Sequence, residues 1–309
     1  MLLTLILLSV IGLYSYFIFP KNQSPQDYGF IEGFHQMDNY PLYVARYVGD
    51  YKFNEYLETG RRPSLSSFGC TCFADSLYVG RNFDFPANPA LLLYTDPADG
   101  YRSVSMVDLG YFGYSMIDHP TGPDGLEEAP YMPFDGMNEM GLVVTMAAIP
   151  YADPPSDNEK SVGEIQVIRL LLDYAANIDE VIELLSGYNV VMADPPIHYL
   201  VADANGESMI IEFVDNEMRI YRSAGSGIIT NFIVTSLDLP SSSPCDRYNT
   251  IYYGLMENDV LSKETAFRLL NDSSQPNTIW SCVYDIKNLS VHVVMGRNFE
   301  NVYTFHLEP

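Results

Sequence analysis

Short apolar runs, several of them alternating with polar residues, dominate the chain after residue 75 and are typical of β-strands. Runs of this kind lie at 76–85, 90–109, 141–150, 197–222, 278–296 and 302–309. The second run contains the turn-forming residues 96–100, which predicts a hairpin, and the fourth contains Asn205-Gly206, a strong hairpin turn signal. The residues after 75 therefore predict a protein rich in hairpin-connected strands.

Helical patterns lie together in the middle of the chain and again near its end. Ser161 with Glu164, and Asn177 with Glu180, have the spacing of a capping box, and each pair precedes an apolar pattern of helical period. The second of these helices is expected to end at Gly187, and a further short helix is expected over 263–274. Because strands and helices come in separate blocks, the pattern predicts an α+β fold with largely antiparallel sheets.

The first 69 residues differ from the rest. Residues 2–20 are 19 residues without a charge, long enough to cross a bilayer as a helix. We interpret residues 1–20 as a signal-anchor, with a cleaved signal peptide or a buried core helix as alternatives. Residues 21–69 are polar and tyrosine-rich, and are expected to be a propeptide-like segment packed on the body of the protein, ending in an exposed linker at 60–67. The body, 70–309, is then expected to be exported or membrane-anchored on the extracytoplasmic side.

The charge balance narrows the range of partners. The chain carries 16 basic and 40 acidic residues, a net charge of −24. Such a balance argues against nucleic-acid binding, which needs a basic face, and against electrostatic docking on anionic lipid. Membrane contact is therefore expected only through the N-terminal helix, and oligomerisation is left open.

Cysteine and histidine usage argues against a scaffold of disulfides or metals. Four cysteines are few for a chain of 309 residues, so free thiols are expected, although Cys245 and Cys282 would be able to pair in an exported protein. The five histidines show no metal-ligand spacing, and the acidic residues show no EF-hand spacing. We expect no metal and no cofactor.

The candidate chemistry centres on Cys70, which follows Gly69 and the predicted linker. A glycine carbonyl is open to attack by a thiol, and cleavage there would give Cys70 a free α-amine that serves as its own general base. Arg81 and Asp84 follow in a strand pattern, where they would favour the thiolate and hold the ammonium. The alternatives are a small buried cysteine and a C-x-C metal site with Cys72.

Six sequence blocks, in order, resemble the choloylglycine hydrolase family, which includes bile salt hydrolase and penicillin V acylase. The blocks are GCTCF with YVGRNFDF, FDGMNEMGLVV, HYLVADANGESMIIEF, GIITNF, SPCDRYNT and TIWSCVYD. The resemblance implies an N-terminal-nucleophile (Ntn) hydrolase with a four-layer αββα sandwich that cleaves linear amide C–N bonds. It covers roughly residue 70 to the C-terminus and would make 70–309 the hydrolase domain.

The resemblance also assigns roles to individual residues. It implies that Cys70 is the nucleophile, whereas Cys72 is a poorer fit. It places Arg81 and Asp84 in the family's R-N-x-D element. Asn231 matches the asparagine that helps form the oxyanion hole, and Arg247 matches a late arginine near the nucleophile.

The sequence departs from the family pattern at two points. Ala148 stands where a second oxyanion residue is usual, so a backbone N–H is expected to serve there. In addition, 69 residues precede Cys70, and the Gly-Cys boundary resembles that of penicillin acyltransferase, whose precursor cuts itself.

These features predict a cysteine amidohydrolase that acts on a small N-acyl amide through an acyl-enzyme on Cys70, activated by autoproteolysis at Gly69–Cys70. The alternatives are an acyltransferase with the same acyl-enzyme and a catalytically silent, membrane-tethered binding protein. Residues 70–309 contain 11 basic and 34 acidic residues, which favours a neutral or zwitterionic substrate over an anionic one. Aromatic side chains would line an acyl pocket or pack in the core; these are Phe83, Phe85, Tyr111 and Phe112.

Overall fold

The computed structural model describes residues 29–59, 69–223, 226–237, 243–258 and 260–307. The predicted N-terminal helix and the whole of the predicted linker lie outside these residues. In the described part of the chain, no helix combines the length and the apolar character needed to cross a membrane.

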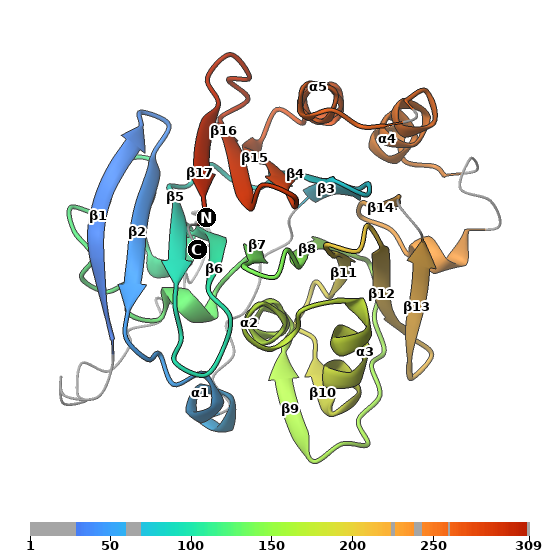
Figure 1. Ribbon diagram of the computed structural model, residues 1–309, viewed down its shortest axis with the longest axis horizontal. Coiled ribbons are helices and arrows are strands. Elements are labelled where there is room, and N and C mark those ends of the chain that lie inside the picture. Colours follow the sequence, from blue (N-terminus) through green and yellow to red (C-terminus); the bar gives the residue numbers. More distant parts are fainter. Residues whose placement is uncertain (1–28, 60–68, 224–225, 238–242, 259, 308–309) are drawn as a thin grey trace, which may run out of the picture.

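The described strands form two stacked sheets (Figure 1). The nine strands of the larger sheet are, in spatial order, β1 (Phe30–Asp38), β2 (Leu42–Val48), β5 (Ala90–Thr95), β6 (Ser103–Asp108), β7 (Asp135–Asn138), β8 (Val143–Ala148), β11 (Ile197–Ala202), β12 (Ser208–Val214) and β13 (Glu217–Ser223). The six strands of the smaller sheet are β14 (Gly227–Ile229), β3 (Gly69–Ala74), β4 (Tyr78–Asp84), β15 (Thr278–Asp285), β16 (Ser290–Met295) and β17 (Tyr303–His306).

Neighbouring strands in both sheets are antiparallel, except for the pair β2 and β5. A separate parallel pair is formed by β9 (Lys160–Gly163) and β10 (Tyr188–Val191). The mostly antiparallel architecture predicted from the separate blocks of strands and helices is therefore confirmed.

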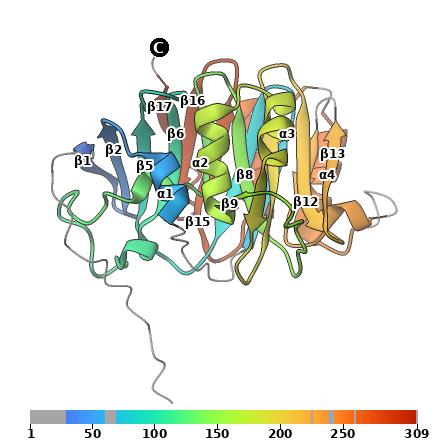
Figure 2. The same cartoon turned by 90° about the horizontal axis from the view of Figure 1, so that it is seen from below.

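Helices cover the outer face of each sheet. Helices α2 (Glu164–Tyr174) and α3 (Ile178–Ser186) lie side by side across the larger sheet (Figure 2), and α4 (Asp246–Met256) and α5 (Lys263–Ser273) pack on the smaller one. A short helix, α1 (Phe53–Thr59), follows β2. The order helix, sheet, sheet, helix is the four-layer αββα sandwich that the resemblance implies.

Two apolar clusters hold these layers together. The main one contains buried side chains from both sheets and from α2, and Cys70 and Cys72 belong to it. A smaller cluster joins the outer face of the six-stranded sheet to α4 and α5 through Phe73, Ile251 and Leu270, among others. The candidate nucleophile, Cys70, is therefore buried between the two sheets.

Residues 30–48, from the segment expected to be propeptide-like, form one edge of the larger sheet. Strand β2 pairs with β5 from Leu42 beside Ala90 to Tyr47 beside Thr95. Tyr47 and Tyr51 are buried, and the Tyr51 hydroxyl donates to Asp173 on α2 at 2.7 Å. This segment shares a sheet with the body; that it acts as a propeptide stays a prediction.

One of the two predicted capping boxes is present. The Asn177 side chain accepts from the Glu180 N–H at 3.1 Å, and the Glu180 carboxylate accepts from the Ala176 N–H at 2.8 Å. The helix ends at Gly187, as predicted. The Ser161 prediction is wrong, because Ser161 lies in β9, where it pairs with β10, and α2 begins two residues after Val162 with Gly163 as its N-cap.

Helix α4 was not predicted from the sequence. Its buried positions Tyr248 and Ile251 have helical spacing, but the exposed Tyr253 interrupts the polar face that such a pattern needs. Aromatic residues also have only moderate helix propensity, so tertiary packing rather than local preference forms this helix.

Asn177, which caps a helix, and Ser161, which does not, make a matched test of the stability that helix capping contributes. Replacing an N-cap Asn by Ala typically costs about 1 kcal/mol. We therefore expect Asn177→Ala to lower the free energy of unfolding in urea by about that amount, and Ser161→Ala to change it much less. Equal losses in both variants would show that the Asn177 cap does not stabilise α3.

Candidate active site

The pairing of β3 with β4 decides which side chains face the space between the sheets. Cys70 lies opposite Phe83, and Cys72 lies opposite Arg81. Since alternate residues of a strand share a face, these four side chains point the same way. The Cys72 thiol lies 3.6 Å from the Met146 carbonyl of the larger sheet, so that face is the inner one.

Asn231 reaches Cys70 because it extends the pairing of β14 with β3. In that pairing Ile229 lies opposite Cys72. Two residues further along the antiparallel register, Asn231 comes beside Cys70, and its side-chain oxygen accepts from the Cys70 N–H at 3.1 Å. An asparagine 161 positions away is thus placed on the backbone nitrogen that cleavage would turn into an α-amine.

Arg81 is buried between the sheets and links them at Cys70. Its Nη2 lies 3.3 Å from the Cys70 Sγ, and its Nη1 lies 3.0 Å from the carboxylate of Asp135, the first residue of β7. The guanidinium also donates to the Phe134 carbonyl, and neither Arg81 nor Asp135 has any exposed side-chain surface. A buried charge needs such a partner to be tolerated.

Asp135 is held in turn by two side chains of β15. The Tyr284 hydroxyl and the Trp280 indole, at 3.3 Å, both donate to its carboxylate. Burial raises the pKa of the Asp135 carboxyl, and Arg81 is the strongest of the groups that oppose this shift. The carboxylate therefore depends on all of its neighbours to remain charged beside Arg81.

Arg247, in the first turn of α4, binds the other side of the Cys70 backbone. Its Nη1 donates to the Cys70 carbonyl at 2.5 Å and lies 3.3 Å from the Asp84 carboxylate. Its Nη2 donates to the Asn231 side-chain oxygen at 2.7 Å. Arg247 therefore joins Cys70, Asp84 and Asn231 in one hydrogen-bonded group.

Asp84 is buried and lies beside Gly69, the residue that directly precedes the candidate nucleophile Cys70. Its carboxylate accepts from the Thr278 hydroxyl at 2.5 Å, and burial raises its pKa against the effects of Thr278 and Arg247. A Cβ added at Gly69 would lie 3.0 Å from the Asp84 Cβ, so glycine is needed for this close approach. The Asp84 carboxylate thus lies beside the Gly69–Cys70 bond.

The structure brings together all five residues expected at the site: Cys70, Arg81, Asp84, Asn231 and Arg247. Cys72 faces the Met146 carbonyl instead, and burial raises its pKa to about 11. Burial also raises the pKa of the Cys70 thiol, while Arg81 favours the thiolate. Burial therefore favours the protonated Cys70 thiol, and Arg81 opposes this effect.

A surface hollow of about 460 Å³, here named the site hollow, opens next to this group. Cys70 is fully buried behind it. The site hollow is lined by Gly69, Asp84, Phe85, Pro86, Ala148, Ile149, Pro150, Asp194, Pro195, Asn231 and Asn277.

Ala148, where the family pattern usually has a second oxyanion residue, presents its carbonyl to Asn231. The Asn231 Nδ2 donates to this carbonyl at 2.8 Å. The Asn231 oxygen faces two donors, the Cys70 N–H and Arg247, so the orientation of the amide follows from its partners. In this form, one hydrogen of the Asn231 amide is bound by the protein itself.

The aromatic residues expected at the pocket divide into two groups. Phe83 is fully buried and stacks on Trp280 at 4.1 Å, so it belongs to the core. Phe85 lines the site hollow, and Tyr111 stacks on its ring at 6.1 Å. Phe112 is half-buried against the main core.

A buried His198–Glu212 pair holds both sides of the segment that carries Asn231. His198 bonds Glu212 at 2.7 Å and the Thr230 carbonyl, just before Asn231, at 2.8 Å. Glu212 also accepts from the Val234 and Thr235 N–H groups, at 2.7 and 2.9 Å. Burial alone would raise the pKa of the Glu212 carboxyl, but its hydrogen bonds and the charge of His198 hold that pKa below its usual value.

Sequence reasoning missed Asp135, Thr278 and the His198–Glu212 pair. Asp135 stands inside the block FDGMNEMGLVV, and a charged residue before a buried strand was the available signal. Thr278 and Glu212 lie in strand patterns, where a single polar residue gives no sign that it is buried, yet both side chains are buried. Only tertiary pairing reveals that these strands are buried on both faces.

In the described ranges, no three His, Cys, Asp or Glu side chains are grouped so as to hold a metal ion. All four cysteines are free thiols, including Cys245 and Cys282.

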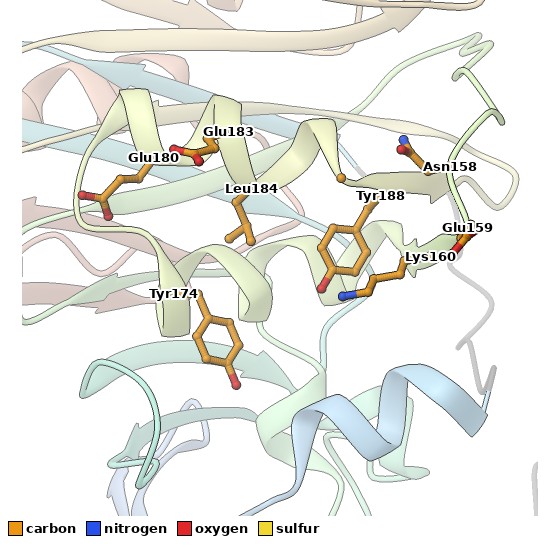
Figure 3. A pocket seen from close by; sticks show the side chains of 9 residues that line it. Asn158, Glu159, Lys160, Tyr174, Glu180, Glu183, Leu184 and Tyr188 are labelled. Carbon is orange, nitrogen blue, oxygen red and sulfur yellow. The ribbon is translucent and has the colours of Figure 1, made fainter.

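A second hollow, of about 600 Å³, lies away from Cys70, between α3, the end of α2 and the β9–β10 pair (Figure 3). The Lys160 ammonium lies 5.8 Å from the centre of the Tyr188 ring there. Glu180 also lines it, but its carboxylate is engaged in the capping box. None of the five predicted site residues lines this hollow.

Asp135 provides a test of the buried link between the sheets. Removing one partner of a buried ion pair typically costs about 3–5 kcal/mol, because the remaining charge is left uncompensated. We expect Asp135→Ala to lower the free energy of unfolding in urea by about that amount. Arg222→Ala, which breaks exposed ion pairs to Asp179 and Glu207, serves as control and is expected to have a much smaller effect. Similar losses in the two variants would contradict this account.

Hydrogen exchange tests whether Glu212 holds the Asn231 segment. Glu212→Ala removes the acceptor of the Val234 and Thr235 amides, and we expect their exchange in the native state to become at least about tenfold faster. Glu217→Ala, at an exposed position of β13, should leave both rates unchanged. Unchanged protection in Glu212→Ala would show that the segment is held by other contacts.

Comparisons with known proteins identify the family and the fold of this chain. A model of the family "Linear amide C-N hydrolases, choloylglycine hydrolase family" matches residues 70–233, more than half of the chain. An uncharacterized protein of Paramecium bursaria Chlorella virus 1 is 33% identical over 108 residues, which are 31% of this chain and 38% of that protein. The matched part thus spans less than two fifths of that relative's length.

Solved structures share the fold at low identity. Penicillin V acylase from Agrobacterium tumefaciens has a TM-score of 0.55 and 18% identity, with 77% of this chain and 86% of the acylase covered. A mutant of conjugated bile acid hydrolase from Clostridium perfringens has a TM-score of 0.56 and 16% identity, with 77% of this chain and 92% of the hydrolase covered. From the family match and the shared fold, the chain belongs to the linear amide C-N hydrolases of the choloylglycine hydrolase family.

Proposed function

We propose that this protein is a cysteine amidohydrolase that cleaves the amide bond of a small N-acyl substrate through an acyl-enzyme on Cys70. The observation that carries the proposal is the set of contacts around one residue. Arg81 contacts the Cys70 thiol, Asn231 its backbone nitrogen and Arg247 its carbonyl. A buried structural cysteine behaves as a small hydrophobic residue and needs no cation at its thiol.

Activation would begin at the Gly69–Cys70 bond. The Cys70 sulfur attacks the Gly69 carbonyl carbon, the Cys70 nitrogen leaves with the thiol proton, and a thioester forms. Water then hydrolyses the thioester, which yields a carboxylate on Gly69 and a free thiol and α-amine on Cys70. The Asp84 carboxylate beside Gly69 and the side-chain oxygen of Asn231 are positioned to hold the new ammonium.

In turnover, the α-amine removes the thiol proton and the thiolate attacks the substrate carbonyl. The Asn231 Nδ2 donates to the Ala148 carbonyl, and in turnover the same amide group would donate to the oxyanion. The α-amine passes the proton to the leaving amine, and water then releases the acyl group as a carboxylic acid. Arg81 stabilises the thiolate that each cycle regenerates.

The buried state of Cys70 also supports a second candidate, a silent relative that binds a ligand without cleaving it. The thiol has no exposed surface, and burial raises its pKa. The proposed cleavage at Gly69–Cys70 would free the chain next to the thiol and expose the thiol to a substrate bound in the site hollow, which is open at the surface before cleavage. We further propose that residues 2–20 export the protein or anchor it to a membrane.

The two neighbouring cysteines allow a matched test of the nucleophile. We expect wild type and Cys72→Ala to show a new N-terminus at Cys70 and to hydrolyse members of an N-acyl amide panel. Cys70→Ala should remain uncut, and its kcat should fall by at least about 10³-fold, as for the loss of a catalytic nucleophile. The measurements are intact mass, N-terminal sequencing and product release.

Full activity in Cys70→Ala or Cys70→Ser would contradict the thiol mechanism. An uncut and inactive wild type that still binds an N-acyl amide would favour the silent relative instead.

A further inference from the structure

A third hollow, here named the proline groove, adjoins the site hollow and has a volume of about 460 Å³. Pro150 lies in the walls of both. The segment 193–196 also lines both, with Ala193 and Pro196 in the proline groove and Asp194 and Pro195 in the site hollow. The proline groove is lined by Pro150, Tyr151, Ala152, Pro154, Pro155, Ser156, Asn189, Val190, Val191, Met192, Ala193 and Pro196.

The proline groove is apolar, and none of the described residues that line it carries a charge. Most of its walls are Pro, Val, Ala and Met side chains. Its polar members include Ser156 and Asn189, and the Asn189 side chain is already bonded to the backbone of Asn158 at 2.9 and 2.7 Å. Such a surface gains free energy by covering apolar groups and offers little to a charged one.

The walls of the site hollow contain two acidic residues, Asp84 and Asp194, and no Lys or Arg among the described residues. Asp84 is paired with Arg247, whereas Asp194 is exposed and gives the hollow its negative charge. The nearby cations Arg81 and Arg247 lie outside its walls. Their guanidinium groups are bound to carboxylates and to the groups around Cys70.

We infer that the substrate is an N-acyl amide whose apolar acyl group lies in the proline groove and whose amine half carries no negative charge. This inference rests on the proposed function, because it uses the site hollow as the place of the scissile amide. It is more specific than the family match, since it derives from Asp194 and from the proline groove of this chain.

The expected size of the charge effect follows from Coulomb's law. Two unit charges about 6 Å apart at a partly hydrated surface interact by about 1.4 kcal/mol, which corresponds to about tenfold in binding. An acyl chain that gains several buried CH₂ groups should add at least another tenfold, because each group contributes about 0.8 kcal/mol when fully buried. Both effects are large enough to measure separately.

Binding to the full-length Cys70→Ser variant tests the inference without requiring turnover. The probes are three octanoyl amides that differ only in the amine: ethanolamine (neutral), ethylenediamine (cationic) and glycine (anionic). We expect the first two to bind at least about tenfold more tightly than the third by calorimetry. N-acetylethanolamine should bind at least about tenfold more weakly than its octanoyl counterpart.

Two variants assign these effects to the two hollows. Asp194→Lys, at an exposed position, should abolish or reverse the preference against the glycine amide while leaving the chain-length effect intact. Tyr151→Asp, also at an exposed position, should reduce the chain-length effect and leave the order of the three amines unchanged.

The inference is overturned if the glycine amide binds as tightly as the ethanolamine amide, if chain length has no effect, or if none of the probes binds at millimolar concentration. Probes that bind in the expected order while the processed wild-type protein hydrolyses none of them would contradict the proposed function and support the inference.

Discussion

The guanidinium of Arg81 sits between the two sheets without any contact with water, and that position constrains everything around Cys70. A buried cation is tolerated only if its charge is compensated, and the larger sheet supplies the Asp135 carboxylate and the chain before it the Phe134 carbonyl. Arg81 itself belongs to the smaller sheet. The same interaction therefore registers the sheets against each other and leaves one guanidinium nitrogen for the Cys70 thiol.

The remaining groups follow from strand register. Arg81 lies two residues before Phe83, the residue opposite Cys70 in the antiparallel pair of β3 and β4, so the Arg81 and Cys70 side chains share a face. Asp84 lies directly opposite Gly69 in the same pair. Asn231 continues the ladder that β14 makes with β3, and the His198–Glu212 pair fixes the chain on both sides of it. Arg247 joins these groups from a different layer of the fold. A shift of one residue in either ladder would separate the thiol from its partners.

Local sequence signals predicted those features that depend on local chemistry. The Asn205-Gly206 hairpin, the Asn177–Glu180 capping box and the hairpin that joins β5 to β6 have physical causes within a few residues. Ser161 shows the limit, since an identical spacing was overridden by parallel pairing of β9 with β10. Positions such as Asp135 and Glu212 gain their roles only from strands distant in the sequence, so neither periodicity nor the family resemblance revealed them.

The central claim, that substrate is acylated onto Cys70, is tested most directly by trapping the intermediate. The processed protein is mixed with an N-octanoyl amide, quenched in acid within the first turnover, and analysed by peptide mass spectrometry. The account predicts an octanoyl group in thioester linkage on the peptide that starts at Cys70, and on the sulfur of that residue alone. An acyl group on Cys72, or product release with no acylated peptide at any quench time, would contradict it.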